Sequence, residues 1–191
     1  MSALLEAEGL VGGRNGQRLF GPLDAALGAG DALLVRGPNG SGKSTLLRIF
    51  AGLLAPMSGV MRANAALRYL GHHDAVKPAL TVGENLVFWR RFHGTGSSEA
   101  ALATVGLDRL AAMPARYLSA GQRRRLALAR VLDPAAKVWL LDEPTNGLDA
   151  SSIATLESVL ARHRAAGGAV VAATHAALDL PQARSLEMGL T

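Results

Sequence analysis

A glycine-rich segment that ends in lysine and serine constrains the fold of this chain more than any other feature. Residues 37–44 read Gly, four residues, Gly, Lys and Ser, which is the pattern of a loop that wraps around phosphate groups. An apolar run at 32–35 precedes the loop and a helical pattern at 43–51 follows it, as such a loop requires. The fixed positions occur by chance in only about one in a hundred chains of this size. The segment therefore predicts an α/β fold that binds a nucleoside triphosphate.

The chemistry of this P-loop follows from its backbone and from two side chains. Its N–H groups curl inward toward phosphate oxygens, and the following helix adds the positive end of its dipole. We expect Lys43 to hold the β and γ phosphates and Ser44 to place its hydroxyl on Mg²⁺. The residues expected to contact the nucleotide here are Gly37, Pro38, Asn39, Gly40, Ser41, Gly42, Lys43, Ser44 and Thr45.

Two further apolar runs, 138–141 and 169–173, also end in chemically useful residues. The first leads to Asp142, which we expect to bind Mg²⁺, and to Glu143, which is placed to polarise the attacking water. The second leads to His175, for which a role at the γ-phosphate competes with the commoner case of a loop histidine without a task. Parallel strands present such residues together at their carboxyl ends.

The rest of the chain divides into an accessory sheet and a helical region. Short strands at 4–11, 23–27 and 59–62 predict the accessory sheet, and residues 76–118 predict an inserted helical subdomain. Together with the parallel core they would form one domain over residues 1–191, an α/β P-loop NTPase. Further helices are expected at 81–92, 97–105, 119–132 and 150–164.

Composition limits the possible classes of protein. The 191 residues are 49% apolar, which suits one compact domain, and no apolar stretch reaches the roughly 20 residues that cross a bilayer. The acidic N-terminus does not resemble a secretory signal, so we expect a cytoplasmic protein without disulfides. The net charge of +5 is compatible with nucleic acid, a membrane face or an anionic cofactor. We interpret arginine groups such as 123–125 mainly as solvated helix faces.

Residues 118–122 identify a family. Ser119 and Gln122 have the spacing of a capping box, which many proteins contain, but a helix N-terminus with a Ser and a Gly can also bind an anion. With the P-loop, the acidic pair, Asp149 and His175 in this order, the whole chain resembles the ABC ATPases. The resemblance implies that ATP with Mg²⁺ is bound between two copies of the chain. The residues implied to act across that interface are Ser119, Gly121, Gln122 and Asp149.

A narrower resemblance lies in residues 69–77, 80–86 and 117–125, which are similar to the CcmA-type subunits of the haem exporter of cytochrome c maturation. It implies an ATPase held by integral membrane permease subunits at the cytoplasmic face of the bacterial inner membrane, with haem as cargo. No nucleic acid partner is expected. Three features depart from the general family pattern. His73 stands where a glutamine contacts Mg²⁺, and Asn146 and Gly147 precede Asp149 where a serine is common. No aromatic ring precedes the P-loop to stack on adenine, so either Arg14 stacks on the base or the base is held loosely.

Three alternatives remain open at this level. The chain could serve another ABC exporter, or it could be a soluble ABC protein that acts on nucleic acid or ribosomes, which its basic charge favours. A P-loop kinase for small molecules would not need residues 119–122. For a transporter, Trp89 is the best candidate for contact with the membrane partner, whereas Phe88 and Phe92 are expected in the core.

Overall fold

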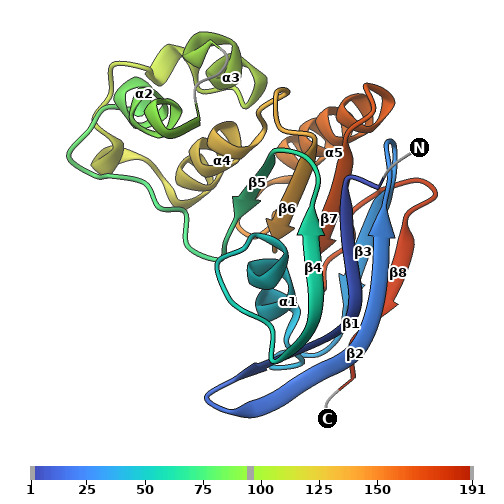
Figure 1. The fold of residues 1–191 in the computed structure, drawn as a ribbon. Helices are drawn as coiled ribbons and strands as arrows, with labels where there is room; N and C mark the ends of the chain where they lie inside the picture. Colours follow the sequence, from blue (N-terminus) through green and yellow to red (C-terminus); the bar gives the residue numbers. More distant parts are fainter. Residues whose placement is uncertain (1–2, 94–96, 190–191) are drawn as a thin grey trace.

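Five parallel strands form the centre of the molecule (Figure 1), which the computed structural model describes for residues 3–93 and 97–189. Their order across the sheet is β5-β6-β7-β3-β8. The strands are β3 (Ala32–Arg36), β5 (Leu67–Leu70), β6 (Val138–Asp142), β7 (Ala169–Ala173) and β8 (Arg184–Glu187). The predicted strands β3, β6 and β7 are the inner ones, and they are apolar up to Arg36 and Asp142, the last residues of β3 and β6, because both faces of the sheet are covered. This arrangement confirms the predicted parallel core.

A second, antiparallel sheet of order β2-β1-β4 confirms the predicted accessory sheet. It consists of β1 (Leu5–Arg14), β2 (Gln17–Leu27) and β4 (Ser58–Ala63). β1 and β2 are longer than predicted because Gly12 continues the strand: its missing Cβ leaves room for the ring of Phe20. The hairpin turns at Asn15 and Gly16, both with positive φ, as a tight two-residue turn requires. The hairpin therefore carries Arg14 out to its tip.

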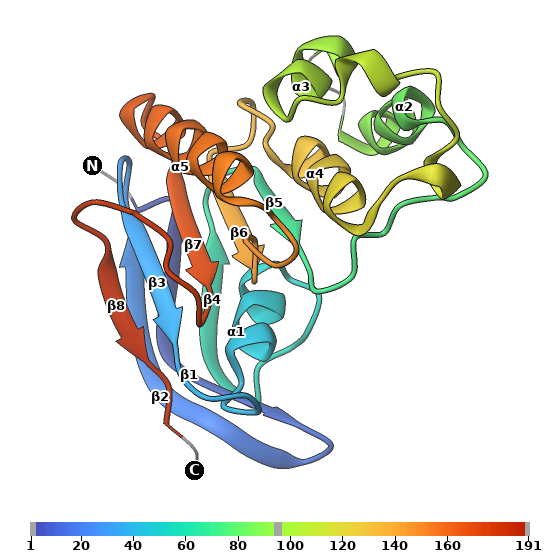
Figure 2. The same cartoon turned by 180° about the vertical axis from the view of Figure 1, so that it is seen from behind.

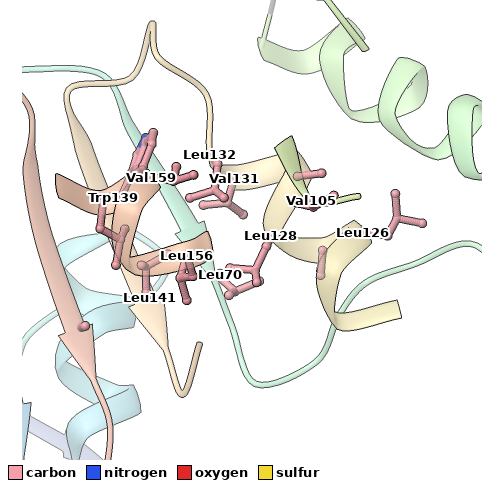
Figure 3. Close-up of a cluster of buried hydrophobic side chains, with 14 of the residues drawn as sticks. Leu70, Val105, Leu126, Leu128, Val131, Leu132, Trp139, Leu141, Leu156 and Val159 are labelled. Atoms are coloured by element: carbon pink, nitrogen blue, oxygen red, sulfur yellow. The ribbon is translucent and has the colours of Figure 1, made fainter. Parts of the chain in front are cut away.

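Helices cover both faces of the parallel sheet (Figure 2). The helix α1 (Lys43–Phe50) lies between the two sheets and buries Leu46, Leu47, Ile49 and Phe50. On the other face, α4 (Ala120–Val131) and α5 (Ala150–Ala165) pack with strands β6 and β7 in a second apolar cluster (Figure 3). Within it the ring of Trp139 stacks on His163 at 3.6 Å between centroids. The sheet thus holds the P-loop helix on one side and α4 on the other.

The segment between β5 and α4 contains helices and no strand, among its described residues. These are α2 (Val82–His93), α3 (Ser98–Thr104) and two short 3-10 turns, Asp108–Leu110 and Ala115–Tyr117. A bridge between Thr81 and Pro114 closes the base of this segment. A capping box opens α2, because the backbone N–H groups of Thr81 and Glu84 each donate to the other residue's side chain. The helical segment stands beside the sheet and packs on α4 (Figure 1).

The prediction that Phe92 belongs to the core is wrong. Its side chain is 68% exposed, because the inner face of α2 is formed by Val82, Asn85 and Leu86. Phe88 is half-buried and Trp89 lies beside it, with ring centroids 5.3 Å apart. Within the described part of the chain, no helix combines the length and the apolar character needed to cross a membrane.

Candidate functional site

The P-loop between β3 and α1 has the curled backbone that phosphate binding requires. Gly37, Gly40 and Gly42 have positive φ, and a Cβ on Gly37 would lie 2.2 Å from the carbonyl oxygen of Met188. The Lys43 ammonium lies inside the curl and donates to the carbonyl oxygens of Gly37 (2.7 Å) and Pro38 (3.1 Å). The first turn of α1 contains no acidic residue, so its N–H groups and dipole favour an anion.

Asp142 lies at the end of β6, next to the P-loop helix. Asp142 is 1% exposed, and its Oδ2 has no hydrogen-bond partner among the residues that the structure describes. Burial raises the pKa of Asp142 above its ordinary 3.8; the hydrogen bond from Ser44 lowers it in part, and the charge of Glu143 raises it further. A buried carboxylate beside a hydroxyl is a fitting oxygen pair for Mg²⁺, which uses few protein ligands and keeps several waters.

Glu143 has a left-handed backbone, with φ 48°, that turns its carboxylate away from the direction of the strand. Such a conformation costs a non-glycine residue roughly 1–2 kcal/mol. Its N–H donates to the carbonyl of Ala173 at 2.7 Å, which ties β6 to β7. Its carboxylate contacts His175: Oε1 lies 2.9 Å from Nδ1, and Oε2 accepts the backbone N–H at 3.4 Å. The chain thus holds Glu143 and His175 as a pair, while 63% of the His175 side chain stays exposed.

One cleft of about 690 Å³ brings the predicted nucleotide-binding residues together. The predicted residues that line it are Arg14, Asn39, Gly40, Gly42, Lys43, Ser44, Thr45, His73, Asp142, Glu143 and His175. Gly37, Pro38 and Ser41 belong to the same loop but do not line the cleft. Within residues 3–93 and 97–189, no group of three or more His, Asp or Glu side chains could hold a metal ion by itself.

The residues predicted to act across an interface form a separate group. The capping box of α4 is present: Ser119 Oγ accepts the N–H of Gln122 at 3.2 Å, and Gln122 Oε1 accepts the N–H of Ser119 at 2.8 Å. A Cβ on Gly121 would lie 2.9 Å from the carbonyl of Gly147, so the start of α4 adjoins the loop before α5. That loop ends in Asp149, an exposed N-cap whose carboxylate accepts the N–H of Ser152 at 2.8 Å. We call residues 119–122 and 147–149 the Ser119 surface.

The Ser119 surface does not line the cleft of its own chain, as far as the described residues show. Asp149 and Ser119 are exposed, and Gln122 is half-buried. Hydrogen bonds to Ser152 and Ser151 hold the pKa of Asp149 below its ordinary value, so its carboxylate stays charged at neutral pH. The surface therefore presents a helix N-terminus and a hydroxyl outward.

Sequence reasoning missed several residues of the site. Asn15, Gln17, Leu19, Arg48, His72 and Asn146 also line the cleft. Arg124, interpreted as part of a solvated group, is instead 4% exposed and lies behind the acidic pair. The sequence position of Arg124, two residues after Gln122, does not indicate that its side chain is buried. Only the packing of α4 on the sheet decides which arginine of the group points inward.

Comparisons with known proteins agree with this geometry. The sequence profile of the family described as ABC transporter matches residues 20–146. The chain is 49% identical to the cytochrome c biogenesis ATP-binding export protein CcmA of Paramagnetospirillum magneticum, over 95% of this chain and 92% of that protein. It is 50% identical to the protein of the same name from Chelativorans sp., over 97% and 98% of the two chains.

A solved structure supports the same assignment at the level of the fold. A metal-chelate type ABC transporter in an inward-facing conformation superimposes with a TM-score of 0.77 and 30% identity. The match covers 92% of this chain and 74% of that one. The P-loop, the acidic pair, the Ser119 surface and these relatives lead to one conclusion. The chain belongs to the ABC transporter family, in which it is a nucleotide-binding, ATP-hydrolysing subunit.

Proposed function

We propose that this ATPase drives export in cytochrome c biogenesis, with haem as the cargo. The observation that most strongly supports this function is the sequence identity of about 50% to CcmA proteins over almost the whole of both chains. Residues 69–77, which give the narrower resemblance, contain His72 and His73 of the nucleotide cleft. The work of the subunit would be to bind and hydrolyse ATP and to pass the resulting movement to membrane subunits.

We infer the following roles in the cleft. Lys43 and the P-loop N–H groups hold the phosphates, where one pair of unit charges at 4 Å contributes roughly 4 kcal/mol at an effective dielectric of 20. Mg²⁺, held by Ser44 and Asp142, supplies further charge neutralisation at the phosphates. Glu143 polarises the attacking water and His175, held by Glu143, reaches toward the γ-phosphate. His73, exposed at the cleft, would contact this site through water.

In this proposal no aromatic side chain stacks on the adenine ring. Arg14 lies at the tip of the β1–β2 hairpin, is exposed and lines the cleft with Leu19. A guanidinium plane can stack on a purine ring, with a contribution of about 0.5–2 kcal/mol. We therefore propose that Arg14 and Leu19 hold the base.

The Ser119 surface is proposed to complete the site of a second copy. Ser119 and Asp149 are exposed, and the surface lies outside the cleft of its own chain among the described residues, which supports a contact with a neighbouring chain. Ser119 and the N-terminus of α4 suit the γ-phosphate, and Asp149 would link the two sites. Glu143→Gln, which binds ATP without rapid turnover, should then form a dimer in light scattering when ATP is added. A monomer at saturating ATP would contradict the sandwich.

A groove between the helical segment and the core suits the membrane partner. It has a volume of about 520 Å³ and is lined by apolar and basic side chains, including Leu53, Trp89 and Arg130. Leu53 is 66% exposed, and Arg130 lies over the ring of Trp89 at 4.6 Å. We propose that an integral membrane permease subunit inserts a segment with an apolar side chain and a carboxylate here. This would hold the chain peripherally at the cytoplasmic face of the inner membrane.

Complementation tests the function. A bacterial strain that lacks its own CcmA-type gene and makes no holo-cytochromes c should regain haem-stained c-type cytochromes when it expresses this chain. The variant Glu143→Gln, expressed at the same level, should fail because hydrolysis falls by about 100- to 10,000-fold. A wild-type chain that hydrolyses ATP but restores no cytochrome c would assign it to another ABC exporter.

A further inference from the structure

Arg124 joins three separate segments through one buried side chain. It lies on α4, and its residue is 4% exposed. Its Nη2 donates to the carbonyl oxygens of Asp142, at 2.8 Å, and of Glu143. Its Nη1 donates to Asp74 Oδ1 at 3.0 Å and to the carbonyl of Gly71 at 3.3 Å. The planar fork of a guanidinium can serve all four acceptors, whereas the single ammonium of a lysine cannot span them.

The contact with Glu143 matters because the peptide bond after Glu143 leads into Pro144. Proline has no N–H, so the Glu143 carbonyl is the only hydrogen-bonding group of that peptide unit. The carbonyl accepts from Arg124 and, at 3.3 Å, from the N–H of Asn146. The peptide unit before Glu143 is held at both ends, by Arg124 on the Asp142 carbonyl and by Ala173 on the Glu143 N–H.

Arg124 therefore touches both peptide units that flank Glu143. Glu143 has the positive φ of 48°, a conformation that persists only where surrounding contacts determine it. The direction of its carboxylate toward His175 depends on these two units. A side chain that fixes both units fixes the direction of the carboxylate.

The other end of Arg124 holds the loop after β5. Asp74 follows His73, which lines the nucleotide cleft, and the side chain of Asp74 is 29% exposed. Ser119, the cap of α4, is five residues before Arg124 on the same helix. One guanidinium thus connects the helix of the Ser119 surface, the backbone of Glu143 and the loop of His73.

We propose that Arg124 is a positioning residue for ATP hydrolysis, which sets the direction of Glu143 and couples it to the loop of His73 and to α4. The proposal rests on the proposed role of Glu143 at the attacking water. It does not require Arg124 to touch ATP, since none of its described contacts lies with the P-loop. Loss of Arg124 should therefore slow turnover without weakening nucleotide binding.

Arg124→Lys in the full chain is the primary test, with Arg125→Lys as matched control. Arg125 lies on the same helix and donates instead to the carbonyl of Val105, at 3.1 Å. We expect Arg124→Lys to lower kcat about 10- to 100-fold, since a displacement near 1 Å can cost as much. The Kd for ATP, measured by titration with a fluorescent ATP analogue, should stay close to wild type. The Tm should fall by about 2–12 °C, because lysine leaves buried carbonyl acceptors without a donor, and the chain should stay folded at the assay temperature. Arg125→Lys should keep its kcat.

A second variant covers the case in which Arg124→Lys does not fold. Asp74→Ala removes a partly exposed carboxylate and leaves Arg124 its three carbonyl acceptors, so it should fold and lower kcat by about 3- to 10-fold at unchanged Kd. Unchanged kcat in both variants would overturn the proposal. So would a fall in kcat that is accounted for by loss of folded protein at the assay temperature or by loss of ATP binding. If Glu143→Gln hydrolyses ATP at the wild-type rate, the proposed role of Glu143 at the attacking water is wrong. This measurement distinguishes the failure of that role from the failure of the proposal for Arg124.

Discussion

Asp142→Asn should make the nucleotide-free chain more stable while it destroys hydrolysis. The wild-type carboxylate is buried, has one oxygen without a partner among the described residues and lies next to the charge of Glu143. An asparagine amide there is still a buried polar group but carries no charge, so the substitution should recover about 1–2 kcal/mol of the larger cost of burying a carboxylate beside a like charge. For a chain of 150–250 residues this raises the Tm by about 2–8 °C.

The pH dependence of this gain has a definite sign. The folded state raises the pKa of Asp142 above 3.8, so folding favours the protonated carboxyl. That contribution to stability is complete below the ordinary pKa and is lost as the pH rises through the raised one. The Tm of the variant should therefore exceed that of the wild type most at neutral pH, and the two should converge as the pH falls toward 4.

The assay is thermal unfolding followed by circular dichroism, without nucleotide and with a chelator that removes Mg²⁺. Asp149→Asn is the matched control, because that carboxylate is exposed, is a helix N-cap and has a lowered pKa. Asparagine caps a helix as well as aspartate does, so the control should not raise the Tm. A Tm for Asp142→Asn at or below wild type at neutral pH, or a gain that is independent of pH, would refute the reasoning.

Three further substitutions test the other parts of the site. Arg14→Ala should raise the KM for ATP about 3- to 30-fold with kcat preserved, and an unchanged KM in steady-state kinetics would exclude stacking on the base. His175→Ala should lower kcat by about 100-fold or more while ATP still binds; turnover near wild type would leave His175 without a catalytic task. Leu53→Ser should abolish co-purification with the membrane subunits at unchanged Tm, whereas Val60→Ser, at an apolar side chain that is also exposed but lies outside the groove, should not. Equal co-purification of both variants would place the partner elsewhere.

The sequence alone predicted the elements whose signals are local. The three inner strands are continuous apolar runs because both faces are buried, and each leads to a polar residue at the same edge of the sheet. The expected helix starts at 81, 119 and 150 agree with α2, α4 and α5, because Thr81, Ser119 and Asp149 each accept a backbone N–H of the first turn.

Features that depend on tertiary contact were not predictable in this way. Strands β5 and β8 have four residues each and lie at the edges of the sheet, so their sequences lack a clear apolar run. Arg124 is buried and Phe92 exposed because the packing of α4 and α2 decides which side of each helix faces inward. Nothing in residue type distinguishes Arg124 from its two arginine neighbours.

The central claim is that the binding site of the ATP held by Lys43 is completed by Ser119 of a second copy. The most direct measurement is a structure of Glu143→Gln crystallised with ATP and Mg²⁺. We predict two chains in which Ser119 Oγ of each lies within hydrogen-bond distance of the γ-phosphate bound at Lys43 of the other. A nucleotide-loaded structure in which these two groups are far apart for every pair of neighbouring chains would contradict the account.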